Sequence, residues 1–213
     1  FKEGLQVERR NFEHLVSTEE SKCLRHLFFS ERQANKVVGL SKDVAPLQVN
    51  SIAVIGAGMM GAGIAMNFLN VGLSVVIVDT SDETLNKGIE TIKKNYLATV
   101  KKGRLTEEDR DHRISLLSGS TQLSAVAEAD LIIEAVYEEM EIKKTIFKEL
   151  DTLAKPSAIL ATNTSTLDIN VIAAVTGRPD QVIGLHFFSP ANVMQLLEVV
   201  RAEKTSNQVI ATA

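Results

Sequence analysis

The sequence predicts an α/β fold with a doubly wound, mostly parallel sheet, and three observations support this prediction. From residue 51 onward, short apolar runs alternate with segments of helical periodicity, as in chains that build parallel sheets. Residues 52–61 run from an apolar strand into a Gly-x-Gly-x-x-Gly turn, and a helical pattern follows. A second apolar run at 75–78 ends in Asp79. Together these features predict a Rossmann-like domain, preceded by an N-terminal helical linker segment.

Residues 1–36 are highly charged and have the spacing of helices. Ser17 followed by Glu20 matches a capping box, which would open the second of these helices. That helix would carry its large apolar side chains on one face: Leu24, Leu27 and Phe28. Residues 37–50 have no clear period and contain Gly39 and Pro46, so we expect a linker that lies against the next domain.

The alternating pattern beyond the linker predicts the elements of the sheet domain in order. The expected strands are 51–55, 74–79, 114–117, 130–134, 158–161 and 181–186, with one more strand at 193–200. The expected helices are 59–71, 82–101, 106–112 and 138–154, and a further helix begins near residue 205. The chain starts at Phe1 and stops inside this last pattern, so we expect a piece of a longer protein.

The composition argues against several classes of function. The chain has 213 residues, of which 45% are hydrophobic, enough to bury one sizeable core. The net charge is −4 and no basic patch with interleaved aromatic residues appears, so nucleic acid is not an expected partner. The apolar runs are too short for a membrane span. Cys23 is the only cysteine, so no internal disulfide can form, and no metal-ligand cluster surrounds it.

Each glycine of the turn has its own physical role. Gly56 permits the sharp turn after the strand, and Gly61 lets the helix pack closely on that strand. Gly58 has no side chain, so a pyrophosphate can approach the backbone near the positive end of the helix. Asp79 can accept hydrogen bonds from both hydroxyls of a ribose. The alternative is a turn that only packs a strand on a helix, with Asp79 as an N-cap.

Asp79 also bears on the choice of cofactor. A carboxylate at this position would repel the 2′-phosphate of NADP. The next residues, Thr80 to Asp82, include no arginine that could bind this phosphate. The sequence therefore predicts NAD rather than NADP.

Several polar residues lie at the carboxyl ends of the expected strands, where open α/β sheets bind their ligands. His186 ends one strand, and histidine suits the removal of a hydroxyl proton because its pKa lies near neutrality. Glu198 lies between apolar neighbours, so we expect it partly inside the protein and paired, with His186 as the attractive partner. The alternatives are a His186 bonded to the backbone, a plain turn at Asn163–Ser165 and a simple strand-end acid at Glu134.

Four segments occur together in an order that resembles a known family. They are Gly56–Gly61, Ile132–Val136, Thr162–Leu167 and the stretch from His186-Phe187-Phe188-Ser189-Pro190 to Glu198. Together they look like the NAD-binding domain of the 3-hydroxyacyl-CoA dehydrogenases, over roughly residues 50–205. Family members often have Asn-Pro where this chain has Ser189-Pro190, which leaves out any contact from that asparagine.

The resemblance implies a role for each matching residue. His186 would be the general base, Glu198 would orient and stabilise it, and Ser165 would bind the 3-oxygen of the substrate. The resemblance places the remaining residues at NAD: Gly56, Gly58, Met59, Met60, Gly61, Asp79, Glu134, Ala135 and Asn163. It implies no metal ion.

Residues 1–49 resemble the segment that joins hydratase and dehydrogenase in multifunctional β-oxidation proteins. The implied organisation is terminal helices of a hydratase domain at 1–36, a linker at 37–50, the NAD-binding domain at 51–205 and the start of a C-terminal helical region at 206–213. The implied reaction is the NAD-dependent oxidation of 3-hydroxyacyl-CoA to 3-ketoacyl-CoA, with an acyl-CoA thioester as substrate. The intact protein would add a hydratase domain and a C-terminal dehydrogenase domain, and the present chain would be weakly active.

Two other functions stay open from the sequence. One is a non-catalytic dinucleotide-binding module, which would need the glycine turn and Asp79 but not His186 and Glu198. The other is a dehydrogenase of a free 3-hydroxy acid, although such enzymes depend on a lysine motif that does not stand out here. The sequence leaves two compartments open, and of these we expect a bacterial cytoplasm, with a peroxisome as the alternative.

Overall fold

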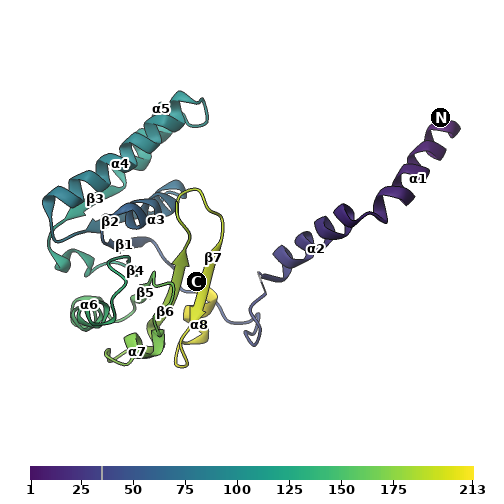
Figure 1. The fold of residues 1–213 in the computed structure, drawn as a ribbon. Helices are drawn as coiled ribbons and strands as arrows, with labels where there is room; N and C mark the ends of the chain where they lie inside the picture. The colour runs from purple at the N-terminus through teal and green to yellow at the C-terminus, as the bar shows by residue number, and fades with distance from the viewer. Residues whose placement is uncertain (35) are drawn as a thin grey trace. The chain divides into compact units, whose positions relative to one another are not determined.

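The structure is a computed structural model that describes residues 1–34 and 36–213, and it divides into two compact units (Figure 1). Phe1–Lys42 form the first unit and Asp43–Ala213 the second. The first unit contains two helices, α1 (Lys2–Val16) and α2 (Glu19–Ala34). Neither helix has a buried residue within the described chain, so Leu24 and Phe28 are exposed. The helical prediction for residues 1–36 is confirmed over α1 and α2, and residue 35, which it includes, lies outside the described residues.

The predicted capping box is wrong by one residue. Ser17 ends α1, where its hydroxyl donates to the carbonyl of His14. The next residue, Thr18, precedes α2 and accepts a hydrogen bond from the Ser21 amide at 3.2 Å. Because the Ser17 hydroxyl is used to close the first helix, the cap of the second helix moves to its neighbour.

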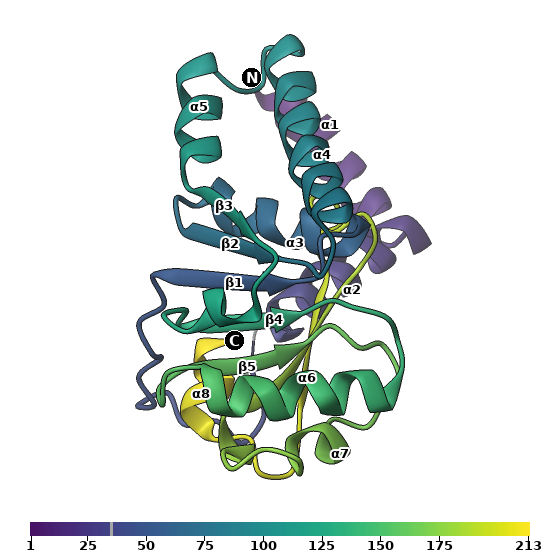
Figure 2. The same cartoon turned by 90° about the vertical axis from the view of Figure 1, so that its left-hand side faces the viewer.

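The second unit is built on a sheet in which the described residues contribute seven strands in the order β3-β2-β1-β4-β5-β6-β7 (Figure 2). The strands are β1 (Ser51–Ile55), β2 (Ser74–Val78), β3 (Leu117–Ser120), β4 (Leu131–Glu134), β5 (Ile159–Thr162), β6 (Val182–Phe187) and β7 (Leu197–Arg201). Strands β1 to β6 are parallel, and β7 pairs antiparallel with β6. This order and the change of direction at β1 confirm the doubly wound, Rossmann-like prediction.

Helices cover both faces of the sheet (Figure 2). The second unit contains α3 (Met59–Asn70), α4 (Asp82–Lys101), α5 (Glu107–Ser115), α6 (Met140–Leu153), α7 (Ile169–Ala173) and α8 (Asn207–Thr212), with short 3-10 turns at Leu123–Val126 and Pro179–Gln181. On one face, Ala53 packs in a cluster with Phe147 and Leu150 of α6. On the other face, Val54 lies against α3 at Gly61. Alternate residues of β1 therefore serve opposite faces, as strand geometry requires.

Two strands differ from their predicted positions. In the segment predicted as a strand at 114–117, residues 114 and 115 are instead the end of α5, and β3 begins only at Leu117. Its sequence, Leu-Ser-Gly-Ser, has little apolar character because β3 lies at the edge of the sheet and is mostly exposed. The strand predicted at 193–200 is shorter and later, at Leu197–Arg201. The weak hydrophobic pattern of β3 locates it poorly, whereas the apolar run that contains β7 begins before the strand does.

Asp130 lies at the amino end of β4, which it directly precedes, and it binds the start of β1. Its Oδ2 accepts hydrogen bonds from the amides of Asn50 at 2.8 Å and Ser51 at 3.0 Å. Its Oδ1 receives Nζ of Lys155 at 2.5 Å. The nearby linker residue Leu47 donates its amide to Oγ1 of Thr212 in α8. The amino ends of the strands are thus occupied by structural contacts, and the candidate site lies at their carboxyl ends.

Candidate functional site

The glycine turn has the geometry that its sequence predicts. Gly56 has φ +100°, and a Cβ atom there would lie 2.7 Å from the Ala135 carbonyl oxygen. A Cβ atom on Gly61 would collide with the Gly56 carbonyl oxygen at 1.8 Å. A Cβ atom on Gly58 would meet no described atom within 4 Å. The two outer positions therefore require glycine for the fold, whereas the middle position leaves open space at the start of α3.

Asp79 lies beside this turn and is held in place by the backbone. Its Oδ2 accepts the amide of Ala57, inside the turn, at 2.8 Å, and its Oδ1 accepts the amide of Ser81 at 3.2 Å. The N-cap of α4 is Ser81, whose hydroxyl accepts the Thr84 amide. The alternative of Asp79 as an N-cap is therefore wrong, and its carboxylate stands at the carboxyl end of β2 next to the space above Gly58.

Two further predicted residues belong to this turn. Met59 opens α3 and is 72% exposed, while Met60 is half-buried. Ala135 follows β4, and its amide donates to the Ile55 carbonyl at 2.8 Å. Its carbonyl faces Gly56, as the close approach described above requires. The backbone after β4 thus lines the same side of the sheet as the glycine turn.

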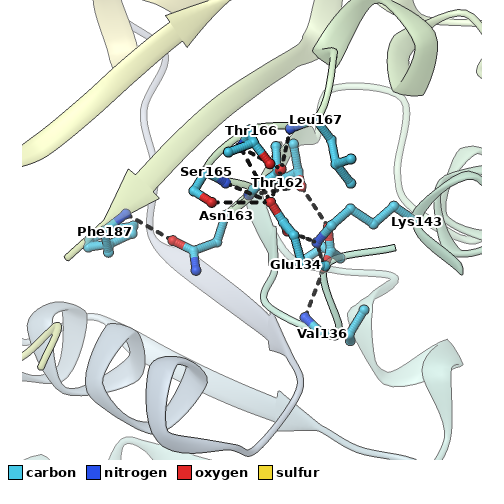
Figure 3. A network of polar contacts seen from close by, with 11 residues as sticks. Glu134, Val136, Lys143, Thr162, Asn163, Ser165, Thr166, Leu167 and Phe187 are labelled. Atoms are coloured by element: carbon cyan, nitrogen blue, oxygen red, sulfur yellow. Dashed lines mark hydrogen bonds and ion pairs between the residues drawn. The ribbon is translucent and has the colours of Figure 1, made fainter. Parts of the chain in front are cut away.

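Glu134 is fully buried and already saturated by protein donors (Figure 3). Its carboxylate receives Nζ of Lys143 at 2.7 Å, the amide of Val136 at 2.8 Å and the hydroxyl of Thr162 at 2.6 Å. Lys143 is itself only 1% exposed. A carboxylate with these partners is a fixed internal charge, so any contact of Glu134 with a ligand is left to its backbone.

Sequence reasoning missed Glu138, which connects this buried pair to the predicted Ser165. One carboxylate oxygen accepts the hydroxyl of Thr164 and the amide of Ser165 at 2.9 Å, and the other lies 3.4 Å from Nζ of Lys143. Burial would raise the pKa of Glu138, but the hydrogen bonds from Thr164 and Ser165 and the charge of Lys143 outweigh it and lower this pKa. The sequence signal that could have identified Glu138 is its position in the loop that follows the carboxyl end of β4.

Asn163 links the Ser165 turn to the next strand (Figure 3). Its Oδ1 accepts the amide of Phe187 at 2.8 Å, and its own amide donates to the Glu134 carbonyl. Phe187 follows His186 directly. Asn163 therefore fixes the end of β6 relative to Ser165, whose side chain is exposed.

The structure brings His186 and Glu198 together. They are opposite partners in the antiparallel register of β6 and β7, and Nδ1 of His186 lies 2.7 Å from Oε2 of Glu198. The His186 side chain is 18% exposed and its ring lies 4.6 Å from that of Phe188. Glu198, which was expected partly inside, is 52% exposed on an edge strand, so about half of its side chain is open to solvent. The predicted pairing nevertheless forms.

The predicted residues therefore gather at the carboxyl ends of β1, β2, β4, β5 and β6, with Glu198 on β7. The model for the 3-hydroxyacyl-CoA dehydrogenase NAD-binding domain matches residues 51–213. This chain belongs to that family. The match covers the whole of the sheet and every residue of the site described above.

Relatives with curated names extend the similarity to nearly the whole chain. The chain is 42% identical over 208 residues to a peroxisomal fatty acid beta-oxidation multifunctional protein of Oryza sativa, covering 97% of this chain and 29% of that protein. It is 41% identical over 218 residues to the peroxisomal bifunctional enzyme of Cavia porcellus, again covering 29% of the relative. The chain thus spans less than a third of the length of these proteins.

Solved structures show the same fold. The 3-hydroxybutyryl-CoA dehydrogenase of Escherichia coli matches with a TM-score of 0.76 and 42% identity, over 77% of this chain and 35% of that one. The dehydrogenase part of multifunctional enzyme 1 from C. elegans matches with a TM-score of 0.72 and 31% identity, over 86% of this chain and 44% of that one.

The residues of this chain fit NAD, the cofactor of the family. Gly58 leaves room for a group to approach the backbone at the start of α3, and amides at a helix start suit a pyrophosphate. Asp79 is held beside this space by Ala57 and presents the carboxylate that a ribose requires.

None of the helices in the described ranges has the length and apolar character needed to cross a bilayer.

Proposed function

We propose that this chain is the NAD-binding part of a protein that oxidises 3-hydroxyacyl-CoA to 3-ketoacyl-CoA in fatty-acid β-oxidation. The observation that carries the proposal is the contact between His186 and Glu198, at 2.7 Å, at the carboxyl edge of the sheet. A module that only binds a dinucleotide needs the turn at Gly56–Gly61 and Asp79. It does not need an imidazole oriented by a carboxylate.

The arrangement suits removal of a proton from the 3-hydroxyl group. In the neutral imidazole, Nδ1–H donates to Glu198, which leaves Nε2 as the unprotonated nitrogen that accepts the hydroxyl proton. The Glu198 carboxylate then stabilises the imidazolium that forms. NAD, when bound, supplies the acceptor for the hydride that leaves the 3-carbon. In the reverse direction, His186 returns its proton to the 3-oxygen.

Ser165 is proposed to bind the 3-oxygen of the substrate. Its hydroxyl is exposed, and its amide is fixed by Glu138 at 2.9 Å. Asn163 ties the same turn to Phe187, the neighbour of His186. A rigid connection between the oxygen-binding group and the base supports a shared role, because proton transfer depends on close and constant geometry.

Asp79 is proposed to bind the adenosine ribose of NAD and to exclude NADP. The exchange Asp79→Ser removes the negative charge that would repel a 2′-phosphate, and it should narrow the difference between NADH and NADPH affinity by about tenfold. Fluorescence titration of both nucleotides measures this. Comparable affinity of the unchanged protein for NADH and NADPH would contradict the proposed role.

We further propose that the intact protein carries a hydratase domain before residue 37 and a C-terminal dehydrogenase domain, as the resemblance of residues 1–49 implies. The Cavia porcellus relative is named a bifunctional enzyme, which supports more than one activity in such a chain. The exposed apolar residues of this chain support additional contacts: on α2 they are Leu24, Leu27 and Phe28, and near β7 they are Val193, Met194, Leu196 and Val200. Of the two locations considered, the relatives' names favour a peroxisome over a bacterial cytoplasm.

The proposed reaction is tested by NADH consumption with acetoacetyl-CoA, with free acetoacetate as the control substrate. This chain should bind NADH but turn over slowly, whereas the intact protein should turn over the thioester alone. Equal turnover of free acetoacetate would instead favour a free-acid dehydrogenase. NADH binding without turnover in the intact protein would favour the non-catalytic module.

A further inference from the structure

The connection between β6 and β7, residues 188–196, determines how His186 meets Glu198, because the two residues lie at its base. In the described chain β7 pairs with β6 only and forms the edge of the sheet. No second strand therefore holds Glu198 from outside, and its side chain is half exposed. The position of residues 188–196 must therefore be fixed by contacts with another part of the second unit.

These contacts are made by α3, which lies beside the connection in both views (Figures 1 and 2). Nδ2 of Asn67 donates to the Ala191 carbonyl oxygen at 2.9 Å. One turn earlier on the same helix, a Cβ atom on Gly63 would lie 3.1 Å from Cβ of Ala191 and 3.2 Å from the amide of Asn192. Ala191 is 1% exposed, so the contact is closed to solvent. The connection is thus both bonded and tightly packed on α3.

We propose that Asn67 and Gly63 are positioning residues that hold the 188–196 connection on α3 and thereby set the contact between His186 and Glu198. Neither residue is part of the proposed catalytic or NAD-binding set. They act through Ala191, in the middle of the connection. Because α3 starts at the glycine turn, one rigid helix then places both the cofactor-binding turn and the general base.

The test uses the ¹⁵N-labelled chain without ligand, and follows the Nδ1–H proton of His186 by NMR. The chain has four histidines, and His186→Gln identifies the signal by removing it. In Asn67→Leu the donor to Ala191 is lost, the connection loosens, and exchange of this proton with water should accelerate about tenfold, as expected when a hydrogen bond to a charged group is weakened. Gly63→Ala should accelerate it too, although alanine favours the helix itself.

Asn70→Leu is the matched control on the same helix. Asn70 accepts hydrogen bonds from Tyr96 and Arg113 and makes none with the connection, so its loss should affect stability but leave the His186 signal unchanged. The proposal is overturned if Asn67→Leu and Gly63→Ala both leave the exchange rate as in the unchanged chain. It is equally overturned if Asn70→Leu accelerates exchange as much as they do, since a general loss of stability then explains the effect.

A kinetic measurement on the intact protein rests on the proposed function as well. With acetoacetyl-CoA, Asn67→Leu should lower kcat by about tenfold or more, because a misplaced base loses its productive geometry, with the KM for NADH changed less than about twofold. An altered NMR signal with no dehydrogenase activity in the unchanged protein would retain the positioning role and reject the proposed reaction. An unaltered NMR signal in a protein that has dehydrogenase activity would reject the positioning role and retain the proposed reaction.

Discussion

Two carboxylates near the carboxyl ends of the strands, Glu134 and Glu198, each contact a basic side chain, but in opposite surroundings. Glu134 is fully buried against Lys143, which is 1% exposed, and accepts two further hydrogen bonds. Glu198 is 52% exposed and contacts an imidazole that can gain or lose a proton. The first pair is closed to solvent and enclosed by protein donors, whereas the second is partly open to solvent. This difference separates a carboxylate that holds the site in shape from one suited to assist a reaction.

The largest effect should follow from breaking the buried pair. Lys143→Met leaves the Glu134 charge buried without its cation, which should lower the free energy of unfolding by about 3–5 kcal/mol. Urea unfolding followed by circular dichroism measures the loss. Lys144→Met is the matched control, because the neighbouring Lys144 pairs with the exposed Glu141 and should change stability by less than about 0.5 kcal/mol. Equal losses of unfolding free energy in Lys143→Met and Lys144→Met would contradict the special role of the buried pair.

Breaking the exposed pair should lower activity strongly and stability only slightly. Glu198→Gln keeps the size of the side chain but removes the charge that orients and stabilises His186. It should lower kcat of the intact protein by about 10²-fold or more while NADH affinity changes little. The free energy of unfolding should change by less than about 1 kcal/mol, since the pair is exposed. An unchanged kcat would remove Glu198 from the mechanism.

Asp130, at the opposite edge of the sheet, extends the comparison to a structural carboxylate outside the site. Burial would raise its pKa, but hydrogen bonds from Lys155, Asn50 and Ser51 lower it to about 2. Since the folded-state pKa is depressed, the stabilisation is present above the unfolded pKa of about 4 and is lost as pH falls toward about 2.

Asp130→Asn should therefore cost about 1–2 kcal/mol near neutral pH, after allowance for solvent screening of this partly exposed pair. The difference from the unchanged chain should shrink in acid, over the window from about pH 4 to about pH 2. Urea unfolding at several pH values checks this, with the exposed Glu128→Gln as the control. A difference that stays constant down to the acid end would show that the charge of Asp130 is not the cause.

The smallest effect is expected at Glu138, which contacts Lys143 of the buried pair and the turn at Ser165. Glu138→Gln weakens the contacts to Thr164 and Ser165, yet the side chain is 40% exposed, so global stability should change by less than about 1 kcal/mol. The change should appear locally, as about fivefold faster hydrogen exchange at the Ser165 and Thr166 amides. Glu139→Gln, one residue later, should leave these amides unaffected. A global loss as large as that of Lys143→Met would place Glu138 with the buried pair.

The sequence by itself determined the α/β class, most of the helix and strand positions and the glycine turn. These features depend on local periodicity and on backbone conformations that only glycine adopts easily, as at Gly56 with its φ of +100°. The same local information located His186 and Glu134 at strand ends, because apolar runs stop where the chain leaves the sheet. It misplaced β3, which has little apolar sequence, and the start of β7, where the apolar run begins before the strand.

Only the tertiary structure decided which of these residues meet. The register of β6 and β7 places Glu198 opposite His186 and exposes it, which its apolar neighbours did not predict. The meeting of Glu138 with Ser165, of Asn163 with Phe187 and of Asn67 with Ala191 joins segments 24 to 124 residues apart. Such contacts leave no periodic trace in the sequence, because each depends on how helices and strands pack rather than on the propensity of either segment.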